Sequence, residues 1–141
     1  MKGIFAIDGR FRRGGLAAIF ALVVLFASPL ALAQCPAHDA AGWGQAIANG
    51  HAWAAHGAQF QAGVVVNGLA YPPPSINNQG EFATLITSII QNPDQHANIA
   101  NGRAKYWLNA SGTIVIVNPH ANDCGTAFRP NNGVTYYNNL N

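Results

Sequence analysis

The chain has 141 residues, of which only 9% are charged, and its formal charge is +2. Four of its seven Lys and Arg residues precede position 14, so residues 34–141 keep three basic against four acidic side chains, a formal charge of −1. This balance counts against a broad positive surface for nucleic acid, but it leaves open a pocket that holds one or two phosphates.

The first 33 residues have the pattern of a signal peptide. They begin with basic residues, continue with an apolar segment over residues 16–26, and end with Ala-Leu-Ala at 31–33. We therefore predict cleavage before Gln34, a secreted or periplasmic protein, and no stable membrane association after cleavage. An uncleaved anchor is the alternative, although the apolar run is short for a membrane span and carries Pro29.

Residues 34–141 are enough for one domain with one core. They contain two cysteines, Cys35 and Cys124. In an oxidising compartment an even pair favours a disulfide, with two free thiols as the alternative.

The first half of this domain is predicted to be helical. Residues 38–60 are rich in Ala and lack Pro, and we expect a helix with a break near Asn49-Gly50 and an end near Gly57. Residues 61–78 carry three consecutive prolines, which predict an extended loop outside the main sheet. Asn78, with Glu81 three residues later, predicts the start of a second helix that ends by Asn92, before Pro93.

The second half is predicted to form a sheet. Residues 103–108 and 113–117 flank Asn-Ala-Ser-Gly, which indicates a hairpin, and the second strand is apolar on both faces and therefore central. Residues 125–129 predict a third strand, and residues 134–140 a short final element. The predicted fold is α+β, with N-terminal helices packed on a small antiparallel sheet and one disulfide.

The residues that several common catalytic mechanisms require are missing or few in residues 34–141. His51 and His56 are five positions apart, about 140° around a helix, so they do not form a zinc-binding pair. Carboxylates are few, and no serine lies in a nucleophile-elbow motif. What remains is histidine with cationic and hydroxyl helpers, which suffices for metal-free RNA cleavage because the substrate's 2′-hydroxyl is the nucleophile.

The cations of the domain lie close together in the sequence. Arg103, Lys105 and Arg129 all fall within residues 102–130. In a domain with so little charge, this placement predicts that the three side chains hold one anion. Solubilising side chains are the plain alternative.

Two segments carry a resemblance to a known family. His-Gly-Ala-Gln-Phe at 56–60, followed by residues 102–130 ending in Gly-Thr-Ala-Phe-Arg-Pro, resembles the C-terminal ribonuclease toxin domains of contact-dependent and polymorphic toxin systems. Those domains are similar to colicin D and belong to the barnase-, EndoU-, colicin- and RelE-like ribonucleases. The resemblance implies helices on an antiparallel sheet, no metal or other cofactor, and RNA, with tRNA as one class, as substrate. It also raises an immunity protein as a second partner.

The resemblance also implies roles for particular residues. His56 matches the catalytic histidine at the helix end and becomes the general base. Arg103 and Lys105 match strand cations that hold the scissile phosphate. Thr126 and Arg129 match the last strand, with Thr126 donating to a phosphate oxygen.

Each assignment has a structural alternative. His56 beside Trp53 and Phe60 could be a packed core residue. His51 could be a second acid or could cover a helix face. Arg103 and Lys105 could lie on a solvated edge strand, and Arg129 could bind main-chain carbonyls instead of phosphate.

The leading hypothesis is a secreted, metal-independent endoribonuclease of toxin or effector type that cleaves RNA through a 2′,3′-cyclic phosphate. The alternatives are a non-enzymatic secreted binding module, with a cleft for an anionic ligand or a protein, and a nuclease fold used only structurally.

Overall fold

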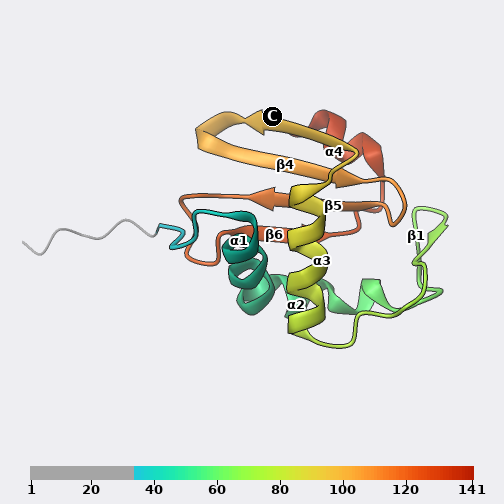
Figure 1. Cartoon of the computed structure of the whole chain (residues 1–141). Coiled ribbons are helices and arrows are strands. Elements are labelled where there is room, and N and C mark those ends of the chain that lie inside the picture. Colours follow the sequence, from blue (N-terminus) through green and yellow to red (C-terminus); the bar gives the residue numbers. More distant parts are fainter. Residues whose placement is uncertain (1–33) are drawn as a thin grey trace, which may run out of the picture.

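The structure, a computed structural model, describes residues 34–141, and the predicted signal peptide lies outside the described residues. Four antiparallel strands form a sheet in the order β3-β4-β5-β6. Helices α1, α2 and α3 lie on one side of it and α4 on the other (Figure 1). This arrangement confirms the predicted α+β class. Within residues 34–141, every helix is too short or too polar to cross a membrane.

The first helical segment changes type along its length. It consists of α1 (Ala40–Ile47), the π-helical turn η1 (Ala48–Ala52), α2 (Trp53–His56) and the 3-10 turn η2 (Gly57–Phe60). Gly50 leaves helical geometry, with ψ of −149°, which confirms the break predicted at Asn49-Gly50. A Cβ atom on Gly50 would lie 2.4 Å from the Cβ of Asp123. Glycine therefore lets this segment approach the loop that precedes β6.

The middle of the chain follows the predicted loop and helix. Two short strands, β1 (Val65–Val66) and β2 (Leu69–Ala70), form a hairpin separate from the main sheet. Helix α3 (Gln79–Gln91) begins after Asn78, whose side chain accepts a hydrogen bond from the Glu81 N–H at 2.9 Å. This cap satisfies one of the amide groups that a helix start leaves free. Both predicted ends of the helix are confirmed.

The main sheet contains one strand more than predicted. Its strands are β3 (Gln95–Ile99), β4 (Arg103–Leu108), β5 (Thr113–Val117) and β6 (Gly125–Phe128). All five residues of β5 are buried, which confirms its central position. The additional strand, β3, is an edge strand with the polar sequence QHANI, and so it lacks the apolar pattern that identifies strands. The turn η3 (Ala100–Gly102) joins it to β4.

Each face of the sheet has its own apolar cluster. The helices α1 and α3 cover one face, where Phe82 and Ile86 pack with Val115. The short helix α4 (Val134–Asn139) covers part of the other, where Tyr137 packs with Trp107. The register pairs Lys105 with Ile116 and Ile116 with Thr126, so these side chains share the face that carries α4.

The predicted disulfide is present between Cys35 and Cys124. It joins the start of the described chain to the residue before β6, and the Cys35 N–H also donates to the carbonyl oxygen of Pro119 at 2.9 Å. The bond spans 89 positions of sequence. It therefore ties the first residues of the described chain to the loop that precedes β6.

Removing this disulfide should destabilise the domain through the unfolded state. We expect the double variant Cys35→Ala/Cys124→Ala to lose about 4 kcal/mol of unfolding free energy, because closing so long a loop removes much chain entropy from the unfolded protein. Urea denaturation measures the loss. A reductant should lower the midpoint of the parent and leave the double variant unchanged, and equal midpoints for both proteins would contradict the expectation.

Candidate functional site

Arg129, directly after β6, is buried and bound to the main chain. Its side chain is 1% exposed and its guanidinium lies over the Tyr71 ring, 5.4 Å from the centroid. Four N–H groups of this guanidinium donate to carbonyl oxygens at 2.6–2.9 Å, those of Gln59, Val64, Leu69 and Ser111. The structural alternative for Arg129 is thus correct, and its assignment as a catalytic phosphate contact is wrong. We call this set of contacts the Arg129 clamp.

Lys105 is also committed to carbonyl groups. It is 7% exposed, and its Nζ donates to the carbonyl oxygens of Tyr137 at 2.6 Å and Leu140 at 2.7 Å. These carbonyls lie at the end of α4, where the free oxygens of a helix favour a positive charge. The Nζ also lies 4.4 Å from the centroid of the Tyr137 ring. Lys105 therefore fastens α4 to the sheet, and its predicted phosphate contact is wrong.

Arg103 is the most accessible of the three cations. Its Nε donates to the main-chain oxygen of Ala100 at 3.1 Å and its Nη2 to that of Asn141 at 3.0 Å. Its Nη1 has no hydrogen-bond partner among residues 34–141. Arg103 and Lys105 are two positions apart on β4 and point to the face that carries α4. The Arg129 guanidinium instead lies over Tyr71, which belongs to the cluster under α1 and α3.

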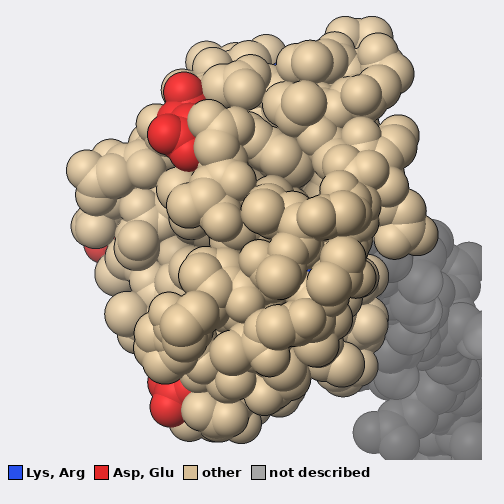
Figure 2. All heavy atoms as spheres, turned by 90° about the vertical axis from the view of Figure 1, so that its right-hand side faces the viewer, with Lys and Arg blue, Asp and Glu red and all other residues tan. Residues whose placement is uncertain are grey.

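The predicted convergence of three cations on one anion is therefore wrong. Each Lys and Arg side chain in the described part of the chain already donates hydrogen bonds to main-chain oxygens. The one face drawn in Figure 2 agrees, because it shows separate acidic side chains and no cluster of Lys or Arg. The three cations therefore cannot hold one anion together.

A variant distinguishes the structural role of Arg129 from a catalytic one. Arg129→Met should lower the unfolding free energy by at least about 3 kcal/mol, because several buried carbonyls lose their donor together. Thermal and urea denaturation measure this loss. Arg129→Lys should restore only part of it, since an ammonium cannot reproduce the guanidinium geometry. A fully stable Arg129→Met protein without activity would restore the phosphate role.

Two histidines from the first helical segment lie along β6. His56, at the end of α2, is half-buried, and its ring lies 5.2 Å from that of Phe128. Burial lowers the pKa of His56, and the nearby charge of His51 lowers it further. His56 is therefore neutral near pH 7, which is the form that a general base requires.

His51 forms a pair with Asp123. Its Nδ1 lies 2.5 Å from Oδ2 of the carboxylate, and its side chain is 57% exposed. Burial acts to raise the pKa of Asp123, but hydrogen bonds from His51 and from the Gly125 N–H outweigh it, so this pKa is lowered. An ionised Asp123 fixes the orientation of the ring and leaves Nε2 as the free nitrogen.

Thr126 supplies a hydroxyl on the same strand. Thr126 and Phe128 are two positions apart on β6, so their side chains point to the same face. The Thr126 Oγ1 is buried and has no hydrogen-bond partner among the described residues. An unsatisfied buried hydroxyl is costly and calls for an explanation. We call the group formed by His51, His56, Asp123, Thr126 and Phe128 the histidine site.

Asp123 was not predicted from the sequence, and helical spacing placed the two histidines on different sides of one helix, although His51 was predicted as a possible second acid. An ideal straight helix puts His51 and His56 about 140° apart, but the chain leaves helical geometry at Gly50 and both side chains reach β6 or the loop before it. Asp123 lies 72 positions from His51. No local pattern reveals such a pair, although the predicted disulfide at Cys124 already placed this loop near the N-terminal segment.

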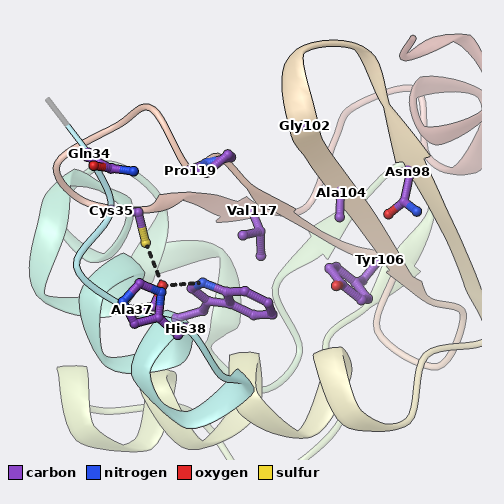
Figure 3. A pocket seen from close by; sticks show the side chains of 11 residues that line it. Gln34, Cys35, Ala37, His38, Asn98, Gly102, Ala104, Tyr106, Val117 and Pro119 are labelled. Carbon is purple, nitrogen blue, oxygen red and sulfur yellow. Dashed lines mark hydrogen bonds between the residues drawn. The ribbon is translucent and has the colours of Figure 1, made fainter. Parts of the chain in front are cut away.

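A separate hollow lies beside the disulfide (Figure 3). Its volume is about 330 Å³, and its walls come from residues 34–38, from Trp43 and from the sheet. The Trp43 indole donates to the carbonyl oxygen of Ala37 at 3.1 Å. Tyr106 and Val117 line it and belong to the cluster under α1 and α3, so this hollow lies on the opposite face from Thr126. It does not belong to the histidine site.

Comparisons with known proteins add no family to this geometry. The chain matches no family model, and no curated protein or solved structure is similar to it. The resemblance to ribonuclease toxin domains stays a prediction from the residues. Among residues 34–141, no three His, Cys, Asp or Glu side chains are grouped to hold a metal ion.

Proposed function

We propose that this protein is a secreted, metal-independent endoribonuclease of toxin or effector type. The observation that carries the proposal is the placement of a neutral His56 and of a His51 held by Asp123 along β6, the strand that also carries the buried Thr126 hydroxyl. Two histidines supply the base and the acid that cleavage by the 2′-hydroxyl needs. The predicted signal peptide and the disulfide support a secreted or periplasmic location.

The proposed reaction assigns one proton transfer to each histidine. His56 takes the proton of the 2′-hydroxyl, and the 2′-oxygen forms a bond to phosphorus. The bond from phosphorus to the 5′-oxygen breaks, and protonated His51 gives the Nε2 proton to that leaving oxygen. The products are a 2′,3′-cyclic phosphate and a free 5′-hydroxyl.

The charge that develops on phosphorus needs donors other than Lys105 and Arg129. Within the histidine site, protonated His51 on η1 and the Thr126 hydroxyl on β6 are the groups that can supply them. A phosphate oxygen would give the Thr126 hydroxyl a hydrogen-bond partner. Because this hydroxyl is buried, neighbouring side chains would have to shift when the substrate binds. The substrate class remains RNA, with tRNA as one candidate, and an immunity protein is the proposed second partner.

One observation favours a second function. The three cations of residues 34–141 bind carbonyl oxygens, and acidic side chains mark the surface in Figure 2. Both features suit a non-enzymatic module that binds a protein better than one that binds RNA. Incubating the mature protein with total RNA and a chelator separates the two functions, because RNA that stays intact at high protein concentration would favour the binding module.

His56→Ala should reduce RNA cleavage at least about a hundredfold, since a positioned base typically contributes 10²–10⁴-fold. Initial rates and melting temperature should be measured together, with the melting temperature nearly unchanged. The matched control is His96→Ala, which removes a histidine from β3 at the opposite edge of the sheet and should keep full activity. The base assignment fails if His56→Ala stays active or loses activity only by unfolding.

The titration of His56 can be followed by NMR without turnover and by the pH profile of cleavage. Its pKa should lie below 6.5, because burial and the charge of His51 both disfavour the imidazolium form. The acid limb of the kcat/KM profile should therefore have its midpoint below pH 6.5. In His51→Ala, the pKa of His56 should rise, since one of the two causes is removed. Ring-proton NMR shifts measure both values, and a His56 pKa at or above 6.5 in the parent would refute the neutral-base assignment.

A further inference from the structure

An open hollow lies where β4 begins and β5 ends. Its volume is about 490 Å³, and its lining residues are Asn101, Arg103, Asn118 and His120. Ala104 pairs with Val117, so Arg103 and Asn118 lie side by side at the next position of the ladder. This hollow brings together Arg103, the most accessible of the three cations, and His120, which is not part of the histidine site.

The lining of this hollow fits an anion with several acceptor oxygens. Arg103 is always charged, and His120 can carry a second positive charge. The Asn118 Oδ1 accepts a hydrogen bond from the backbone N–H of His120 at 3.0 Å. The side-chain NH₂ of Asn118 is left to donate to a ligand. No Asp or Glu lines the hollow. A phosphate matches this set, because arginine and amide N–H groups donate to its oxygens.

The guanidinium of Arg103 is held in place before any ligand arrives. Two of its nitrogens bind the main-chain oxygens of Ala100 and Asn141, and Nη1 is left without a partner among residues 34–141. A side chain fixed in this way loses little conformational entropy on binding. The same hydrogen bonds therefore hold the guanidinium in place and leave Nη1 free to donate to a phosphate in the hollow.

The hollow and the His51–Asp123 pair of the histidine site lie at the same end of the sheet. Arg103 is two positions from Lys105 on β4, so its side chain points to the same face as Lys105 and Thr126. The loop from Asn118 to Asp123 connects them directly, since it carries His120 in the hollow and Asp123 beside His51. The Asn118 N–H also donates to the Cys124 carbonyl oxygen at 2.7 Å, which closes this loop.

We propose that this hollow is a phosphate-binding subsite for the RNA substrate, which holds a phosphodiester flanking the one that is cleaved. The inference rests on the proposed ribonuclease function for its substrate. It also accounts for how a domain with a formal charge of −1 in residues 34–141 can bind RNA, because a fixed site replaces a broad positive surface.

Titration of the mature protein with inorganic phosphate tests the subsite without any activity. ¹H–¹⁵N NMR at low ionic strength should show saturable shifts of the Asn101 and Asn118 side-chain amides and of the Arg103 Nε–H. His120→Ala should weaken this binding about tenfold, whereas His96→Ala should not change it. Absence of saturable shifts at these groups would overturn the subsite, whether or not the protein cleaves RNA.

Cleavage kinetics test the link to the substrate. For an RNA oligonucleotide, His120→Ala should raise KM about tenfold with little change in kcat. A dinucleoside monophosphate has only the scissile phosphate, so its KM should respond far less. Equal responses of the two substrates would overturn the role in RNA binding. Phosphate shifts at the hollow in a protein that leaves RNA intact would keep an anion site and refute the ribonuclease function.

Discussion

The Arg129 clamp is the contact on which the rest of the structure depends. It joins η2, the β1–β2 hairpin and the β4–β5 turn to the end of β6 through four carbonyl oxygens. The backbone N–H of Arg129 adds a bond to the Gln59 side chain at 2.9 Å. Gln59 is three residues beyond His56, and Arg129 directly follows Phe128. The clamp therefore also keeps the His56 ring against Phe128. A residue that the sequence suggested for catalysis acts by positioning the segment that carries the candidate base.

Because the Lys and Arg side chains of the described chain bind carbonyl oxygens, few positive charges are left for a functional site. A domain with three Lys and Arg residues in positions 34–141 uses each of them to satisfy carbonyl groups that turns, a loop and a short helix leave free. Positive charge at the histidine site must then come from imidazole, and its amount changes with pH. A site of this kind suits proton transfer better than tight electrostatic binding. The proposed subsite at Arg103 would supply part of the missing attraction.

Local signals predicted most of the fold because they act over a few residues. The Asn78 cap, the break at Gly50 and the Asn-Ala-Ser-Gly turn each set the backbone directly, and each lies where the sequence placed it. The polar strand β3 was not predicted, because its extended conformation depends on hydrogen bonds to the neighbouring strand β4 and not on its own sequence pattern. The candidate site was harder to predict. Nothing near Arg129 or Lys105 in sequence shows which oxygens they bind, since their partners lie 18–70 positions away.

The two anchors at the ends of β6 explain why the histidines lie beside it. Before the strand, Cys124 is bonded to Cys35, and after it Arg129 binds Gln59. The chain from position 35 to position 59 is thus fastened at both ends of one strand. His51 and His56 lie within that stretch, and they meet Asp123 and Phe128, the neighbours of the two anchoring residues. Neither histidine needs a rigid helix to hold it, so the non-helical geometry at Gly50 is tolerated. The disulfide and the buried arginine together hold a short, kinked helical segment in the fixed geometry that the proposed proton transfer would require.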